Sequence, residues 1–188
     1  MWMVISSGSA GIAGTKGMAA FCADISKGFL MELMLKPVIA VEVTAESDTR
    51  LPVVLAAKTG NSQWRTLGKL FGLSQFGVNL ETLAPGGLSS LKHWHTESDE
   101  FIYVIDGELM LATGNGEWLL KEGMCAGFKA GVQNAHHLLN RSARPATFLV
   151  VGSRNATDRV YYPDDDLQWI ETDGGPRRAA RKDGTLYE

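Results

Sequence analysis

Short apolar runs, each closed by turn-forming residues, follow one another from residue 75 to residue 151 of this 188-residue chain. Runs of this length are typical of β-strands, and the Pro-Gly-Gly, Asp-Gly and Gly-Asn-Gly sequences that close them are typical of tight turns. Strands spaced about 8–12 residues apart predict an antiparallel sandwich or barrel. The predicted strands cover residues 76–83, 100–105, 108–113, 117–120, 136–139 and 147–151.

The segments on either side of this region do not show the regular alternation of short apolar runs and turn residues. Residues 53–73 are interpreted as loops with one short helix. Residues 1–35 are predicted to be a weakly structured extension, and a native start at Met31 or Met34 would place most of it outside the protein. Residues 36–167 are assigned to one domain with its barrel at about 73–154, and residues 168–188 to a polar C-terminal arm. Either this arm packs over the barrel or a neighbour, or it is a solvated tail.

Composition excludes several classes of partner. The net charge of -3 comes from 18 basic and 21 acidic residues that are interspersed, so we expect no positive face for nucleic acid. No apolar run approaches the ~20 residues of a membrane span, so no membrane segment is expected. Cys22 and Cys125 form neither a CxxC pair nor a disulfide framework, which is compatible with a cytoplasmic protein. Cys125 is interpreted as a small buried residue rather than a nucleophile.

Two of the four histidines, His93 and His95, are separated by a single residue in a predicted strand. Side chains two apart point to the same face of a strand, so these imidazoles aim at one point while Trp94 faces away. Glu100 has the wrong parity for a straight strand, but the polar residues 96–99 can bend the chain and restart it. We therefore expect Glu100 to face the two histidines. Imidazole and carboxylate are the side chains that hold catalytic transition metals.

The other two histidines are adjacent, so the predicted strand sends them to opposite faces. Counting back from Asn140 puts His136 on one face with Leu138 and Asn140, and His137 on the other. Parity alone does not say which face is inward. Asn79 and Glu81 share a face of the preceding strand, and either they line the cavity or Glu81 faces solvent. The sequence identifies no general base.

Gly87-x5-His93-x-His95-x4-Glu100-x6-Gly107 resembles the first motif of the cupin superfamily at every fixed position. The second cupin motif is matched more loosely, because Lys129 stands where the family has proline and two extra residues precede the histidine. Its members here are Gly123, Gly131, Asn140 and either His136 or His137, and the spacing to Asn140 favours His136. Residues 70–167 are similar to a group of small bacterial single-domain cupins without an assigned activity.

The resemblance implies an all-β fold, a cupin-type double-stranded β-helix (jelly-roll) barrel with irregular N- and C-terminal extensions. It also implies one divalent transition metal, Fe, Mn, Ni or Zn, held by His93, His95, Glu100 and either His136 or the alternative His137. The expected function is that of a metal-dependent enzyme on a small polar molecule, dioxygenase-like or isomerase-like. The alternative is a non-enzymatic, metal-bearing module that binds or senses a small molecule. A homodimer is expected.

Overall fold

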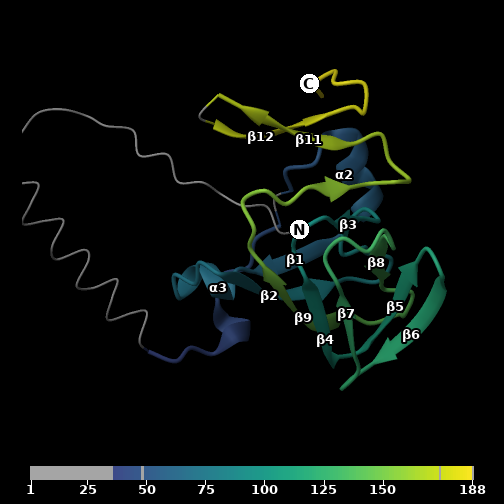
Figure 1. Cartoon of the computed structure of the whole chain (residues 1–188). Coiled ribbons are helices and arrows are strands. Elements are labelled where there is room, and N and C mark those ends of the chain that lie inside the picture. Colours follow the sequence, from purple (N-terminus) through teal and green to yellow (C-terminus); the bar gives the residue numbers. More distant parts are fainter. Residues whose placement is uncertain (1–35, 48, 174, 188) are drawn as a thin grey trace, which may run out of the picture.

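The computed structural model describes residues 36–47, 49–173 and 175–187, and most of its regular elements are short antiparallel strands (Figure 1). The predicted N-terminal extension, residues 1–35, lies outside the described residues. In chain order the elements are η1 (Ala40–Glu42), α2 (Val53–Thr59), β1 (Ser62–Arg65), α3 (Leu67–Leu70), β2 (Phe76–Leu83), β3 (Trp94–His95), β4 (Glu100–Asp106), β5 (Glu108–Thr113), β6 (Gly116–Lys121), β7 (Cys125–Phe128), β8 (His136–Leu139), β9 (Ala146–Ser153), β10 (Val160–Tyr161), β11 (Gln168–Thr172) and β12 (Gly175–Ala180).

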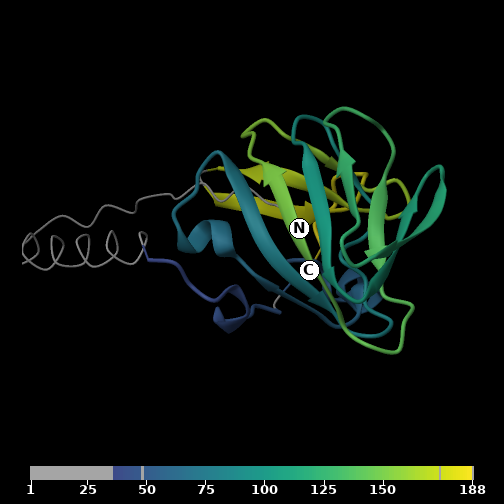
Figure 2. The ribbon, with the colours of Figure 1, turned by 90° about the horizontal axis from the view of Figure 1, so that it is seen from below.

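Two antiparallel sheets form the barrel. One has five strands in the order β1-β2-β9-β4-β7, and the other has three in the order β6-β5-β8. Figure 2 shows their strands facing each other across the interior. The longest pairing joins β2 to β9 from Phe76 opposite Ser153 to Leu83 opposite Ala146. The predicted all-β jelly-roll fold is therefore confirmed, and each of the six predicted strands is present within two residues of its predicted ends.

The core lies between the two sheets because the strands alternate between inward and outward side chains. Along β9, Ala146, Phe148 and Val150 are buried while their neighbours are half-buried. Ile102 and Val104 of β4 point into the same core, as the parity of Glu100 predicts. Burying each such side chain contributes about 1.5–3 kcal/mol, so this interior supplies much of the stability that holds the barrel closed.

Two interpretations of the sequence are wrong. Residues 53–73 contain two short helices and strand β1, because β1 finds its partner in the edge of β2, where Arg65 lies opposite Leu80. In α3, Gly68 lies so close to β2 that a Cβ there would be 2.8 Å from the Val78 nitrogen. Cys125 is exposed, because it begins β7 at the outer edge of the five-stranded sheet.

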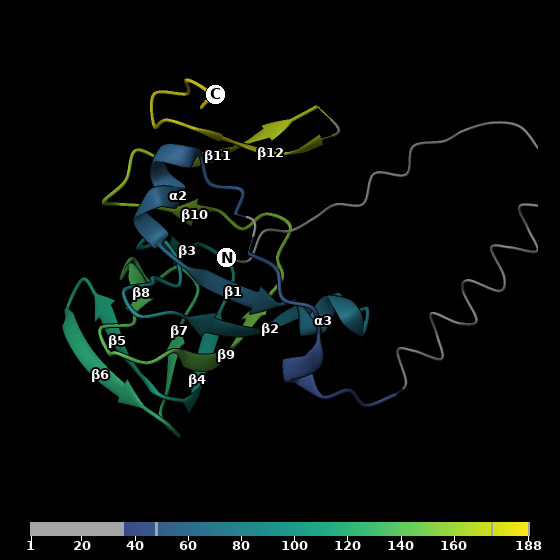
Figure 3. The same ribbon diagram turned by 180° about the vertical axis from the view of Figure 1, so that it is seen from behind.

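The C-terminal residues form a hairpin, β11–β12, that packs beside α2 (Figures 1 and 3). Trp169 and Ala179 of the hairpin contact a second apolar cluster that is separate from the barrel core. The members of that cluster are Leu51, Leu55, Leu91, Tyr162 and Leu167. The hairpin is thus a small outer layer beside β10, which pairs with β3 in a separate two-stranded ribbon. Among the described residues, no helix is long and apolar enough to cross a membrane.

Candidate metal centre

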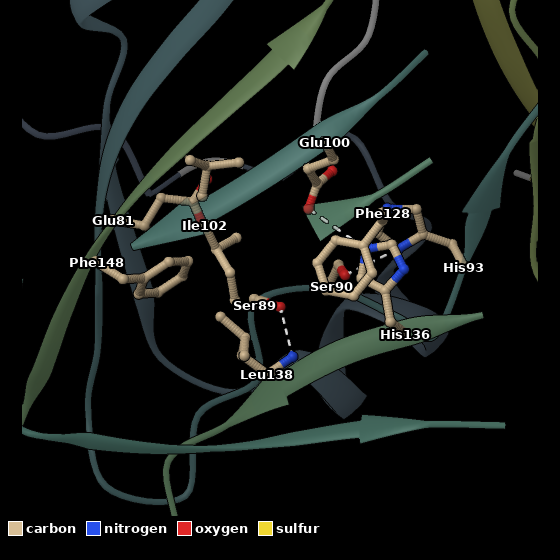
Figure 4. A pocket seen from close by; sticks show the side chains of 11 residues that line it. Glu81, Ser89, Ser90, His93, Glu100, Ile102, Phe128, His136, Leu138 and Phe148 are labelled. Atoms are coloured by element: carbon tan, nitrogen blue, oxygen red, sulfur yellow. Dashed lines mark hydrogen bonds and ion pairs between the residues drawn. The ribbon is translucent and has the colours of Figure 1, made fainter. Parts of the chain in front are cut away.

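His93, Glu100 and His136 meet inside the barrel, and each offers a ligand atom within 4.8 Å of the others (Figure 4). Backbone pairing explains their approach. The N–H of His93 donates to the carbonyl of His136 at 3.1 Å, and the N–H of His136 donates back at 2.8 Å. The two imidazole centroids are 5.1 Å apart as a result. Glu100 begins β4 on the facing sheet, so the cluster bridges the two layers.

Glu100 is held as a carboxylate by its neighbours. Its Oε1 lies 3.4 Å from His136 Nε2, and its Oε2 lies 3.9 Å from His95 Nε2. Burial would raise the pKa of Glu100, but the hydrogen bond from His136 and the nearby histidines lower it to about 2. His95 therefore borders the tighter trio, on the side of Glu100 that faces away from His136.

The two adjacent histidines of β8 have different surroundings. His136 is buried on the inward face together with Leu138 and Asn140. His137 is half-buried on the other face, and its Nδ1 lies 3.3 Å from the Ser90 carbonyl oxygen, to which it donates. Within the part of the chain that the structure describes, His137 does not belong to the cluster. The structure thus turns His136 toward Glu100 and His137 away from it.

The imidazoles present their Nε2 atoms to the cavity. His93 Nδ1 lies 2.9 Å from the Leu91 carbonyl oxygen, and a carbonyl only accepts, so Nδ1 carries the proton and Nε2 keeps its lone pair. Burial lowers the pKa of His93 to about 3, which keeps the ring neutral. A neutral imidazole whose Nδ1–H donates to a backbone carbonyl, so that Nε2 is free to bind, is typical of metal sites.

His136 differs from His93 and His95, whose Nδ1 atoms have hydrogen-bond partners behind the ring. Among the described side chains, its Nδ1 is a buried polar atom without a hydrogen-bond partner. An unsatisfied buried group costs about 1–3 kcal/mol, and its Nε2 faces a carboxylate rather than an apolar neighbour. Three imidazoles and one carboxylate around a small cavity suit a divalent transition metal with open coordination positions.

Two cavities adjoin the cluster. The inner one, about 20 Å³, is lined by the three clustered residues and by Glu81 at its other end, with Ile102 between (Figure 4). Its volume suits a single water molecule. The outer one, about 220 Å³, is lined by His95, Glu100 and His136 and by Lys129. Small molecules therefore fit the outer cavity, and the inner cavity suits only water.

Glu81 faces the interior, so the alternative in which it faces solvent is wrong. It is 5% exposed, and the Asn79 amide donates to its Oε1 at 3.3 Å. Burial raises the pKa of Glu81, and the charge of Glu100 adds to that shift. The inner cavity thus contains two carboxyl groups whose pKa values are shifted in opposite directions, lowered for Glu100 and raised for Glu81.

Comparison with known proteins agrees with this architecture. The family described as Cupin domain matches residues 79–152. A crystal structure from Silicibacter pomeroyi, described as a sugar phosphate isomerase from a cupin superfamily, is 40% identical to this chain with a TM-score of 0.74, and the match covers 81% of this chain and 97% of that one. The chain belongs to the cupin superfamily. No curated protein matches its sequence.

More distant structures share the cupin fold alone. A putative sugar phosphate isomerase from Acidithiobacillus ferrooxidans is 22% identical with a TM-score of 0.67, and the match covers 81% of this chain and 94% of that one. A predicted oxalate decarboxylase from Thermotoga maritima is 19% identical with a TM-score of 0.53, and the match covers 64% and 100%. The described activities differ, so the barrel by itself does not define a reaction.

Asp158 belongs to the surroundings of His95, although no motif in the sequence singles it out. It follows β9, and its Oδ2 accepts from His95 Nδ1 at 2.6 Å while its Oδ1 accepts from the Glu97 N–H at 2.8 Å. Burial would raise the pKa of Asp158, but these hydrogen bonds lower it to about 2. Arg177 of β12 donates to the Asp158 carbonyl oxygen at 2.9 Å. The hairpin therefore braces the carboxylate that orients His95.

Replacing Asp158 by asparagine is expected to lower metal affinity about 10–100-fold, the usual cost of losing a carboxylate behind a ligating histidine. The amide would turn a donor toward either His95 or the Glu97 N–H, and both are donors themselves. Competition with a fluorescent chelator measures the affinity. Asp164→Asn, at an exposed carboxylate, is the matched control and should leave the affinity unchanged. Equal metal affinity in both variants would show that Asp158 does not support metal binding through His95.

Proposed function

We propose that this cupin is a metal-dependent isomerase of a small hydroxy-carbonyl compound such as a sugar phosphate. The observation that carries the proposal is the buried cluster of His93, Glu100 and His136, which opens into a cavity sized for a small molecule. The 40% identical relative described as a sugar phosphate isomerase supports the same substrate class. His93, His95, Glu100 and His136 would hold the metal.

The chain's own side chains have distinct roles in this proposal. A bound divalent metal would act as a Lewis acid on the carbonyl of the substrate. Lys129, exposed at the outer cavity, attracts an anionic group and orients the substrate. Glu81 would accept the proton from the substrate as a carboxylate and return it as the acid. A water molecule in the inner cavity would relay the proton, because Glu81 lines the inner cavity and not the outer one.

The non-enzymatic alternative has one observation in its favour. Phe128 stacks on the His136 ring with centroids 3.4 Å apart, and it lines both cavities. A ligand in the outer cavity would then meet the cluster from one side only, without direct contact with Glu81. Such an arrangement suits a module that binds or senses a small molecule. The same ligand set would also serve a dioxygenase-like reaction.

The deciding experiment begins with protein purified without added metal, whose metal content is measured by mass spectrometry. A panel of aldose and ketose phosphates is then followed by NMR, with oxygen consumption recorded in parallel. Interconversion that a chelator abolishes and added metal restores is the expected result. Substrate-dependent oxygen uptake would instead establish a dioxygenase-like activity. Tight binding without turnover of any kind would establish the binding module.

We also infer that the protein forms a homodimer. The outward face of β4 exposes an apolar row, Phe101, Tyr103 and Ile105, each about 42% exposed. Contiguous apolar side chains on a sheet are typical of contact surfaces between subunits. Light scattering should give twice the chain mass, and Phe101→Glu should shift it toward the monomer. A monomer in the unmodified protein at micromolar concentration would contradict this assignment.

A further inference from the structure

A third cavity, of about 450 Å³, lies outside the barrel between the β3–β10 ribbon and the β11–β12 hairpin. It is larger than either cavity beside the metal centre. Trp94 lines both this cavity and the outer cavity of the metal centre, so its indole lies between the two. Its volume falls within the ~300–1,000 Å³ of small-molecule sites. The proposed isomerase chemistry makes no use of it.

Flat aromatic surfaces form part of its wall. The rings of Trp94 and Tyr161 stack with centroids 4.7 Å apart and an interplanar angle of 11°. Trp169 of β11 adds a second indole, and its Nε1 donates to the buried Tyr162 hydroxyl at 3.2 Å. That hydrogen bond fixes the indole in place. Fixed indole faces suit a ligand that contains a ring.

The charged side chains of the wall are all cationic: Arg159, Arg177 and Lys182. Glu171 pairs with Arg159 at 3.2 Å and with Arg177 at 2.7 Å, so a single carboxylate serves two guanidinium groups. The Lys182 ammonium donates to the Pro163 carbonyl oxygen at 3.2 Å, and no carboxylate pairs with it among the described residues. The three cationic side chains of the wall thus have only one carboxylate paired with them among the described residues, that of Glu171.

We propose that this cavity is a second ligand site, separate from the metal centre, for a phosphate monoester that carries a ring. A phosphate monoester has a charge of about −1.5 to −2 at pH 7, so the cationic side chains of the wall attract it. Arginine and lysine are the side chains that bind phosphate best, and the indoles pack against the ring. The site does not depend on the proposed isomerase activity, because none of its cationic side chains contacts a proposed metal ligand. Arg159 and Arg177 reach the metal centre only indirectly, through the Asp158 carbonyl oxygen.

Isothermal titration calorimetry with four probes tests the site. The probes are AMP, ribose 5-phosphate, inorganic phosphate and adenosine. Either phosphorylated ring compound is expected to bind at least about 10-fold more tightly than inorganic phosphate and adenosine, because it alone engages both the cations and the indoles. Tight binding of AMP with weak binding of ribose 5-phosphate would identify a nucleotide site. Tight binding of ribose 5-phosphate with weak binding of AMP would identify a sugar phosphate site.

A matched pair of lysine variants separates this site from the metal centre. Lys182→Gln, and independently Arg159→Gln, should weaken AMP binding about 10-fold, since each removes one charge-assisted hydrogen bond to the phosphate. Lys129→Gln, at the outer cavity of the metal centre, should leave the AMP affinity unchanged, because AMP has no free carbonyl group for that centre to bind. Thermal unfolding confirms that each variant is folded. Loss of binding in Lys129→Gln alone, or no binding of any phosphorylated ring compound at millimolar concentration, would overturn the proposal.

Discussion

Replacing His136 by alanine is expected to remove stoichiometric metal from the protein, whereas replacing its neighbour His137 should leave the metal in place. His136 is 3% exposed and faces Glu100, while His137 contacts the Ser90 carbonyl on the other face of the strand. Loss of one of the four proposed ligands also leaves the Glu100 carboxylate with one fewer imidazole beside it. Metal content per chain after dialysis, measured by mass spectrometry, gives the answer.

The pair His136→Ala and His137→Ala is informative because both substitutions remove one imidazole from the same short strand. Any general weakening of β8 therefore affects both variants, and thermal unfolding measures it separately. Metal retained in His136→Ala and lost from His137→Ala would reverse the assignment of the fourth ligand. Metal retained in both would place the ion outside this cluster.

The second large effect is expected from Glu81→Gln, which should reduce turnover about 10²–10⁴-fold, as removal of a general acid–base group does. Metal content should not change, because Glu81 lies at the far end of the inner cavity from the clustered residues. Glutamine has nearly the same shape as the protonated acid, and its carbonyl can still accept from the Asn79 amide. The kcat for the substrate found above, with metal saturating, is the quantity to compare.

The same substitution should change how stability depends on pH. The pKa of Glu81 is raised in the folded protein above the 4.5 of an ordinary glutamate, so above pH 4.5 the unfolded chain loses this proton first. The folded state then binds more protons, and its stability falls as pH rises toward the folded pKa. Glu81→Gln should lack this decline in denaturant unfolding at pH 5 and pH 8. Glu122→Gln, at an exposed site, should behave as the unmodified protein does. If Glu81→Gln shows the same decline as the unmodified protein, the pKa of Glu81 is not raised in the folded state.

Local pattern was enough to predict the barrel strands, because each inward face of β4, β8 and β9 depends on a two-residue period that is visible in the sequence. The parity of Glu100 also followed from that period, once the polar bend before it was recognised. The choice between His136 and His137 did not, because a period defines two faces without saying which one the other sheet covers. That information lies in the pairing of His136 with His93.

Features that depend on distant partners were not predictable. Strand β1 exists because the edge of β2 is available to it, and its own sequence has little strand character. Asp158 meets His95 across 63 residues of chain, and a single aspartate after a strand carries no pattern of its own. The cavity beside the C-terminal hairpin likewise combines residues from three separate stretches.

The contacts from Arg177 through Asp158 to His95 mean that the proposed metal site depends on residues outside the barrel region. Residues 79–152 contain the four proposed ligands, but the carboxylate that orients one of them, and the arginine that holds its backbone, lie after that region. Transplanting the motif-bearing strands into another barrel would transfer the ligands without their support. Substitutions in the hairpin would then change metal affinity while the four proposed ligands stay the same. A comparison of the motif residues alone would not detect such a change.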